Sequence, residues 1–290
     1  MSRILEIISY DPLWPKMFEE EAQKIKAALG ENYSSLYHIG STSVVSLAAK
    51  PIIDILLVVN KITDSYPEAL ASLDYKFRGR IVSPLSNFYQ KGIPQPQFHL
   101  HLYEEGDEAI GLHLSLQHYL RNHPSEIISY SQLKFHLQEK YKDKNDYAQY
   151  RIEKAPFIED LLQKAKFEGL TLNYIESSLN KNASEKDWII FKEFQKEEFL
   201  NFKDDDTLFN ACISEKDHLY FSLKKGLTVV TVAHVVMLDS HKAFLKSIAT
   251  FDSLEGKKYA QKIFELLQKW ANSHHYHWVQ DTMFSKINSI

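Results

Sequence analysis

One short run of residues, from 52 to 59, limits most strongly what this chain can fold into. Its sequence is Ile-Ile-Asp-Ile-Leu-Leu-Val-Val, which is apolar except for a single aspartate. Such a run is typical of a buried strand. A carboxylate at Asp54 is costly there unless it lies at a strand end, is paired, or holds a metal ion. The run therefore predicts a sheet in which Asp54 needs a partner.

Strand and helix patterns follow one another along the chain in two series. In the first, apolar residues recur at helical spacing from Pro15 to Leu29, and Gly30 stands where a helix stop belongs. This series also predicts strands at 4–9, 35–39 and around 99–102, and helices at 65–73, 113–121, 125–139 and 147–167.

The second series begins near Gly169, where the order of elements restarts. It predicts strands at 170–175, 218–224, 227–238, 243–250 and 275–280, a loop at 251–258 and a helix at 259–272. With 290 residues the chain also exceeds the usual length of one domain. We therefore expect two domains, 1–168 and 169–290, each an α/β or α+β unit.

Composition excludes several classes of protein. Hydrophobic residues make up 44% of the chain and the formal net charge is -4, so we expect no broad basic surface for nucleic acid. No apolar run approaches the ~20 residues that span a bilayer, so we expect no membrane segment. The one cysteine, Cys212, cannot form an intramolecular disulfide. By elimination we expect a cytoplasmic protein.

The segment from Tyr37 to Ser43, Tyr-His-Ile-Gly-Ser-Thr-Ser, is the most distinctive local feature. Gly40 permits a tight turn, and Ser41 and its neighbours can offer hydroxyl and backbone N–H groups to a phosphate. The same residues also fit a plain turn cap, with Asp54 paired to Lys50. Spacing alone leaves both interpretations open.

Two histidines, His99 and His101, alternate on an expected strand and so project from one face. Beside Asp54 they would ligate a divalent metal ion or contact a phosphate. A polar surface face is the alternative that the pattern leaves open.

The first half resembles the GrpB family. The resemblance rests on residues 10–15, 38–43 and 49–55, on His99-Leu100-His101, on residues 119–124, and on Tyr130 with Leu133-Lys134. It implies a nucleotidyltransferase fold, a mixed sheet flanked by helices, that handles a nucleotide or another phosphorylated small molecule. The residues implied to bind phosphate are Gly40, Ser41, Thr42, Lys50 and Arg121. Ser41 and Asp54 would be catalytic, and Asp54, His99 and His101 would hold a metal ion, with Mg²⁺ expected.

Three departures from the family pattern limit what the resemblance implies. Leu56 stands where the general fold has a second carboxylate, and metal-assisted nucleotidyl transfer usually needs two or three. Gln117 and His118 replace the usual Arg-Asp, and Val45-Ser46 stand where Pro-Gly is common. Arg121 matches a family position and suits bidentate binding of phosphate, while helix capping or a salt bridge suits it equally.

The second half resembles the GNAT N-acetyltransferase superfamily in element order and in one motif. The strand 243–250 is followed by Glu-Gly-Lys-Lys-Tyr-Ala at 255–260 and a long amphipathic helix. In that superfamily such a turn cradles the pyrophosphate of acetyl-CoA at a helix N-terminus. The resemblance implies acetyl-CoA contacts from Ile248, Thr250, Gly256, Lys257, Lys258 and Ala260.

Other features of the second half depart from an active acetyltransferase. Phe284 stands where a proton-donating tyrosine is usual, and little or no room is left after it for the final strands of that fold. We therefore expect an unpaired sheet edge at which a homodimer could form. His234, Asp239 and His241 are candidate bases or plain surface residues. We therefore expect a transferase of nucleotidyl or acetyl groups or, as the alternative, a catalytically inactive regulatory protein that binds a nucleotide and acyl-CoA.

Overall fold

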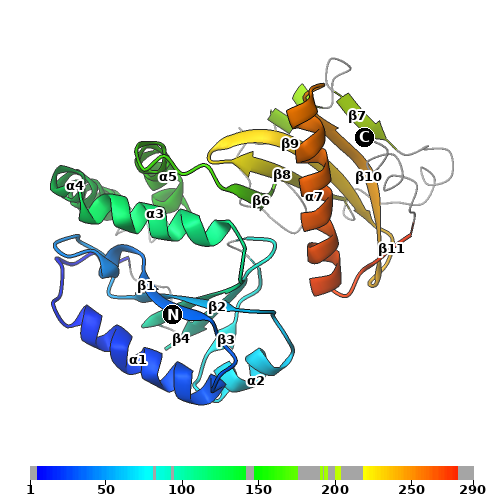
Figure 1. Cartoon of the computed structure of the whole chain (residues 1–290). Helices are drawn as coiled ribbons and strands as arrows, with labels where there is room; N and C mark the ends of the chain where they lie inside the picture. The colour runs from blue at the N-terminus through cyan, green and yellow to red at the C-terminus, as the bar shows by residue number, and fades with distance from the viewer. Residues whose placement is uncertain are drawn as a thin grey trace. The chain divides into compact units, whose positions relative to one another are not determined.

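The computed structural model describes residues 5–80, 83–92, 95–141, 147–175, 190–191, 193–194, 200–203 and 218–279 (Figure 1). The chain divides into two compact units, one of Met1–Val82 with Ser86–Gly169 and one of Ser83–Leu85 with Leu170–Ile290. Each unit is described by itself below. Cys212, Phe284 and the edge expected after the last strand lie outside the described residues.

The N-terminal unit is built on a five-stranded mixed sheet, in the order β1-β2-β5-β4-β3. Its central strands β2 and β5 run parallel, and the other neighbours are antiparallel. The strands are β1 (Ser35–Ile39), β2 (Ile53–Val59), β3 (Lys76–Phe77), β4 (Asn87–Lys91) and β5 (Phe98–Glu104). The buried strand expected at 52–59 is thus confirmed as β2, while β3 and β4 were missed by the sequence patterns.

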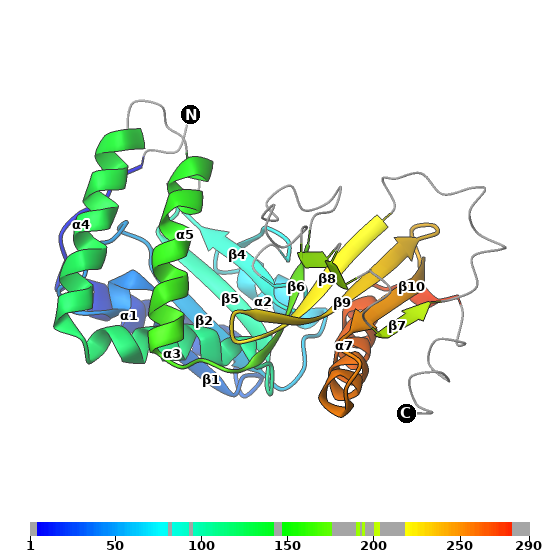
Figure 2. The same ribbon diagram turned by 90° about the horizontal axis from the view of Figure 1, so that it is seen from above.

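Helices cover both faces of this sheet (Figures 1 and 2). One face packs against α1 (Trp14–Leu29) and α2 (Ser65–Ala71) through a core that includes Ile53, Ile55 and Leu57. The other face lies toward α3 (Ala109–Arg121), α4 (Pro124–Tyr141) and α5 (Tyr147–Lys164). Because side chains alternate along a strand, Leu56 and Val58 pack with Ala109 on that second face, and Asp54 belongs to the same set.

The C-terminal unit has a second mixed sheet, in the order β11-β10-β9-β8-β6, with β7 also paired to β10. The strands are β6 (Leu170–Tyr174), β7 (Leu200–Lys203), β8 (His218–Lys225), β9 (Thr228–Met237), β10 (Lys242–Thr250) and β11 (His277–Trp278). All pairs are antiparallel except β10 with β11.

The long helix α7 (Leu254–Ser273) packs on one face of this sheet through Ile263, Leu267 and Trp270. Phe191 and Phe194 pack on the other face with Val232. Two layers therefore bury the apolar residues of β8, β9 and β10, which explains why these strands read as apolar runs in the sequence.

Most expected elements are confirmed, and two are wrong in an informative way. The expected strand at 4–9 is reduced to one bridge between Ile8 and Ala49. The expected loop at 251–258 ends early because α7 begins at Leu254, capped by the Ser253 hydroxyl, which accepts a hydrogen bond from Gly256 N. None of the described helices combines the length and apolar character that a bilayer crossing requires.

Candidate functional site

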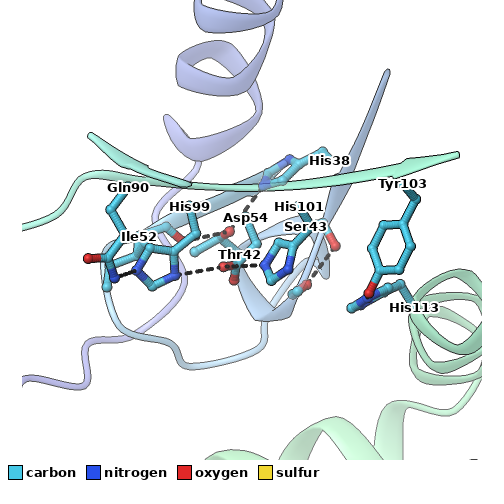
Figure 3. Close-up of polar contacts among 11 residues, drawn as sticks. His38, Thr42, Ser43, Ile52, Asp54, Gln90, His99, His101, Tyr103 and His113 are labelled. Carbon is cyan, nitrogen blue, oxygen red and sulfur yellow. Dashed lines mark hydrogen bonds and ion pairs between the residues drawn. The ribbon is translucent and has the colours of Figure 1, made fainter. Parts of the chain in front are cut away.

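Polar side chains collect on the face of the N-terminal sheet that lies toward α3, α4 and α5. Asp54 on β2 is the register partner of His99 on β5, and His101 follows two residues along on the same face. His99 Nδ1 lies 3.1 Å from Asp54 Oδ1, and His101 Nε2 lies 3.9 Å from the same oxygen (Figure 3). Gln90 Nε2 lies 3.1 Å from His99 Nε2 and can donate to it. Through these two contacts Asp54 and Gln90 fix the orientation of the His99 ring.

The carboxylate of Asp54 is held in its charged form. Burial alone would raise its pKa, but the neighbouring His101 ring and the hydrogen bond with His99 outweigh this effect and bring the pKa well below its usual range. His101 is 9% exposed, and its Nδ1 is buried without a hydrogen-bond partner. The two histidines are therefore the partners of Asp54 that the sequence predicted it would need.

The turn after β1 approaches the Asp54 carboxylate most closely at Gly40, the residue before Ser41. Gly40 has φ +69°, and a Cβ added there would overlap the Asp54 carboxyl group. Ser43 Oγ donates to the Gly40 carbonyl at 2.6 Å, and Thr42 Oγ1 donates to the Ile52 carbonyl at 3.2 Å. Glycine is thus required at position 40 by both backbone conformation and space.

Lys134 on α4 reaches the same turn, a role that the sequence analysis missed. Its Nζ lies 2.6 Å from Ser41 Oγ and 2.7 Å from the Ala48 carbonyl, and 3.9 Å from the centre of the Tyr130 ring. The residue is 3% exposed, and burial followed by the charge of Lys154 brings its pKa well below the usual value. The sequence did contain a sign of this role, because Lys134 lies on the apolar stripe of α4. The buried residues of that helix are Ile127, Tyr130, Lys134, Leu137 and Tyr141.

These groups open onto one cavity of about 490 Å³. Its lining residues include Ser41, Thr42, Lys50, Asp54, His99, His101, Lys134, Tyr150, Arg151 and Lys154. Four of them are cationic, and Asp54 is the one carboxylate among them. The ammonium groups of Lys50 and Lys154 both lie near the Tyr150 ring, 4.4 and 5.6 Å from its centre. The cavity therefore carries an excess of positive charge.

The expected phosphate-binding residues do not all meet at this cavity. Ser41, Thr42 and Lys50 line it, and Gly40 lies directly beneath the Asp54 carboxylate. Arg121 instead donates from Nη2 to the Ser43 carbonyl at 2.8 Å and lines a separate hollow with Phe18 and Val45. Its place therefore favours a role in fixing the turn.

The expected metal ligands do lie together, but as a hydrogen-bonded group. Over the part of the chain that the structure describes, no set of three His, Cys, Asp or Glu side chains is arranged to hold a metal ion. Asp54 Oδ1 already accepts from His99. A metal ion at Asp54 would need further oxygen ligands from a bound molecule.

The turn expected to bind acetyl-CoA in the C-terminal unit uses its polar groups internally. Gly256 N donates to Ser253 Oγ at 2.9 Å, Lys257 N donates to the Ser253 carbonyl at 3.0 Å, and Thr250 Oγ1 donates to the Gly256 carbonyl at 3.2 Å. In this structure the backbone amides of Gly256 and Lys257 therefore form a helix cap.

The remaining residues of that expected site are mostly buried. The side chains of Ile248, Thr250 and Ala260 are fully enclosed in the core, while Lys258 is exposed. The backbone of β10 from 247 to 250 pairs with β7 on one side and β9 on the other. β7 therefore already occupies the edge of β10 to which a ligand could pair as an additional strand.

The candidate bases of the C-terminal unit lie apart from that turn. His234 stacks on the Tyr220 ring with centres 4.5 Å apart, and burial, followed by the charges of His218 and Lys246, lowers its pKa to about 3. Asp239 accepts from the backbone of His241 at 2.7 Å in the exposed turn between β9 and β10. The interpretation as surface residues therefore fits Asp239 and His241.

Fold and site together define the N-terminal unit as a mixed α/β domain with a cationic cavity beside a carboxylate–histidine cluster. The family model for GrpB protein matches residues 4–164, and the chain belongs to the GrpB family.

Individual relatives match the same part of the chain. YqkA, a UPF0157 protein of Bacillus subtilis, is 36% identical over 154 residues, which are 52% of this chain and 45% of YqkA. BH1888, a UPF0157 protein of Halalkalibacterium halodurans, is 34% identical over 164 residues, 56% of this chain and 82% of that protein. This chain thus spans less than half the length of YqkA.

A solved structure supports the fold of the N-terminal unit. The crystal structure of the conserved protein GrpB from Enterococcus faecalis is 35% identical and has a TM-score of 0.52. The match covers 55% of this chain and 96% of that one.

Proposed function

We propose that the N-terminal unit binds the phosphate groups of a nucleotide or another phosphorylated small molecule in the cavity around Ser41. The observation that carries this proposal is the excess of basic side chains among the described lining residues, where Lys50, Arg151 and Lys154, together with Lys134, accompany one carboxylate. Positive charges gathered in a partly buried site are costly unless an anion compensates for them. Burial, followed by the charge of Lys154, lowers the pKa of Lys134, and burial lowers the pKa of Lys154 although the charge of Asp54 opposes it.

Each lining residue has a role in this proposal. Lys50, Arg151 and Lys154 donate to the phosphate oxygens, with Arg151 suited to a bidentate contact. Asp54 receives Mg²⁺ that arrives with the phosphates, because Mg²⁺ is commonly held by one or two carboxylates together with substrate oxygens. His99 and His101 keep Asp54 charged for that purpose.

Binding is proposed here without two-metal nucleotidyl transfer. That chemistry needs carboxylates to bridge two ions, and the position two residues after Asp54 is the fully buried Leu56. Among the residues that the structure describes, the lining of the cavity supplies no second acid. The regulatory or binding alternative is therefore the better supported form of the function.

Thermal unfolding with and without ligand tests the proposal. We expect ATP, ADP or inorganic phosphate to raise the melting temperature, and a ligand at 100 times its Kd adds about 2.7 kcal/mol of apparent stability. Lys154→Met should remove the shift and Asp54→Ala its Mg²⁺-dependent part. Lys140→Met should keep both, because Lys140 is exposed, pairs with Glu153 and is not among the lining residues of the cavity. A wild-type protein that none of these ligands shifts, or a Lys154→Met variant that shifts like the wild type, would contradict the proposal.

We propose acyl-CoA binding by the C-terminal unit as a second candidate. It is favoured by the strand order, in which an antiparallel series from β6 to β10 is followed by α7 and by a parallel β11. Lys258 at the start of α7 is exposed and available to a phosphate. A shift in melting temperature with acetyl-CoA that Lys258→Glu removes would support it, and no shift with acetyl-CoA would contradict it.

A further inference from the structure

The contact between Ser41 and Lys134 has the geometry of a nucleophile and its base. Lys134 Nζ lies 2.6 Å from Ser41 Oγ, within the range of a short hydrogen bond. Both residues line the cationic cavity, so the serine hydroxyl is reachable by a bound molecule. Serine–lysine pairs are one of the known variants of nucleophile activation.

We propose that Ser41 attacks the phosphorus of a bound phosphate anhydride, such as a nucleoside triphosphate, with Lys134 as its general base. The proposal rests on the proposed phosphate binding, because the other cations of the cavity would hold the anhydride beside Ser41. It adds a covalent step that needs no second carboxylate.

The surroundings of Lys134 suit a neutral amine. A neutral amine has two N–H donors and one lone pair, whereas an ammonium has three donors. In the structure Lys134 Nζ donates to Ser41 Oγ and to the Ala48 carbonyl, and the Tyr130 ring faces it. Once Lys134 has lost one proton, its lone pair can replace the donor that points at Ser41 and accept the serine hydroxyl.

The charges near Lys134 act in both directions. Burial is the largest influence, and it acts with the charges of Lys154 and Lys50 to favour the neutral amine, while Asp54 opposes them. Tyr130 also faces the amine, and its own pKa is raised well above the usual value by burial.

The proposed step balances without any further reactant. The Ser41 Oγ–H proton passes to Lys134 Nζ as the Oγ–P bond forms. Attack at the γ-phosphorus breaks the P–O bond to the nucleoside diphosphate, and attack at the α-phosphorus breaks the bond to pyrophosphate. In either case the electron pair stays on the leaving oxygen, which accepts the proton from Lys134. The product is a phosphoryl or nucleotidyl ester of Ser41, and attack by water on the same phosphorus would release it.

A fluorophosphonate probe tests this chemistry directly, because it transfers a phosphonyl group to an activated serine and releases fluoride. We expect the intact protein to gain one phosphonyl group, peptide mass spectrometry to place it on Ser41, and the labelling rate to rise with pH as Lys134 loses its proton. Labelling of another serine, labelling at a rate that does not change with pH, or no labelling would contradict the proposal.

Variants of Lys134 then distinguish a general base from a residue that supplies only positive charge. Arg cannot act as a base at neutral pH, so Lys134→Arg should label at least ~100-fold more slowly, as should Lys134→Met. Ser129→Ala and Lys140→Arg change exposed residues of α4 that are not among the lining residues of the cavity, and both should label like the wild type. Lys134→Arg labelling at the wild-type rate would overturn the assignment of Lys134.

The same variants distinguish failure of this step from failure of phosphate binding. If Ser41 carries no label but ATP still raises the melting temperature, the covalent step is wrong and the binding proposal stands. If ATP produces no shift while Ser41 is labelled, the phosphate-binding proposal is wrong and the activated serine stands. If Lys134 variants do not fold, the labelled position and the pH profile of the wild type decide.

Discussion

The turn after β1 and the turn after β10 both join a strand to a helical segment, and both were expected to hold phosphate. In the first, Ser41 faces a cavity with Lys50, Lys134 and Lys154. In the second, Ser253 and Thr250 hydrogen bond to Gly256 and close the turn on itself. The same kind of sequence thus produces an open site in one unit and a capped helix in the other.

This difference shows that the residues facing a turn decide its function more than the turn itself. The first turn faces α4, which supplies the buried Lys134, and shares its cavity with Lys154 of α5, both from distant parts of the sequence. The second is filled by its own chain, since a Cβ at Gly256 would overlap the Phe251 carbonyl. A glycine can therefore mark close approach to a functional carboxylate or close approach to the backbone.

The largest expected effect tests the closed turn. Gly256→Ala places a methyl group against the Phe251 backbone, which cannot move as a side chain would, so the C-terminal unit should lose at least about 3 kcal/mol. Urea unfolding followed by the fluorescence of the buried Trp270 measures this loss. Lys258→Ala, on the exposed side of the same turn, should stay within about 0.5 kcal/mol. Equal losses in both variants would break the account of this turn.

The open turn should respond in both stability and binding. Gly40→Ala meets a positive φ and the Asp54 carboxylate, so the N-terminal unit should lose about 2–3 kcal/mol and bind ATP more weakly. Gly30→Ala is the matched control, because its φ of +59° is similar and nothing lies within 4 Å of the added Cβ. It should lose only about 1 kcal/mol. If the two variants unfold alike in urea, the close approach of Asp54 is not what requires glycine at position 40.

The stability of the first turn should also depend on pH through His38, whose Nε2 lies 3.0 Å from Thr42 Oγ1. Burial lowers the pKa of His38 from 6.5 to about 4. Between these values the unfolded chain binds a proton that the folded chain does not, so the free energy of unfolding falls as pH falls, by up to about 1.4 kcal/mol per unit.

His38→Gln keeps a hydrogen-bonding side chain and should make this slope shallower in urea titrations from pH 7 to pH 4.5. Some slope should remain, because burial lowers the pKa of His113 to about 3 in the same sense. An unchanged slope would mean that His38 does not titrate with folding.

The smallest effect should be a gain in stability. Ser46 has φ +67°, a conformation that is strained for serine and easy for glycine. This explains why glycine is common at that position in the family pattern. Ser46→Gly should raise the free energy of unfolding by about 0.5–1 kcal/mol without changing ATP binding. A loss of stability in urea unfolding would contradict this explanation.

Local pattern was sufficient to predict the long elements. Helical spacing from Pro15 to Leu29 predicted α1 nearly to its ends, and the apolar run at 52–59 predicted β2. The short strands β3 and β4 were missed, because β3 has two residues and β4 mixes apolar residues with Asn87, Gln90 and Lys91. Their pairing comes from tertiary structure, which a local pattern does not contain.

The candidate site was predictable only in part. Alternation along the strand placed His99 and His101 on one face, and their contact with Asp54 followed once β2 and β5 became neighbours. Lys134 and Lys154 were not assigned to the site, because they lie on helices more than 80 residues further along the chain. The separation of Arg121 from the cavity likewise depends on how α3 packs.

Calorimetric titration with ATP and Mg²⁺ tests the central claim most directly, that the cavity around Ser41 binds phosphate through its excess of lysines. The wild-type protein should bind one ATP per chain. A Lys50→Met/Lys154→Met variant that melts like the wild type should bind at least about tenfold more weakly, since each charge-assisted hydrogen bond contributes about 1.5–3 kcal/mol. Equal dissociation constants for the two proteins, or no heat of binding in the wild type, would contradict it.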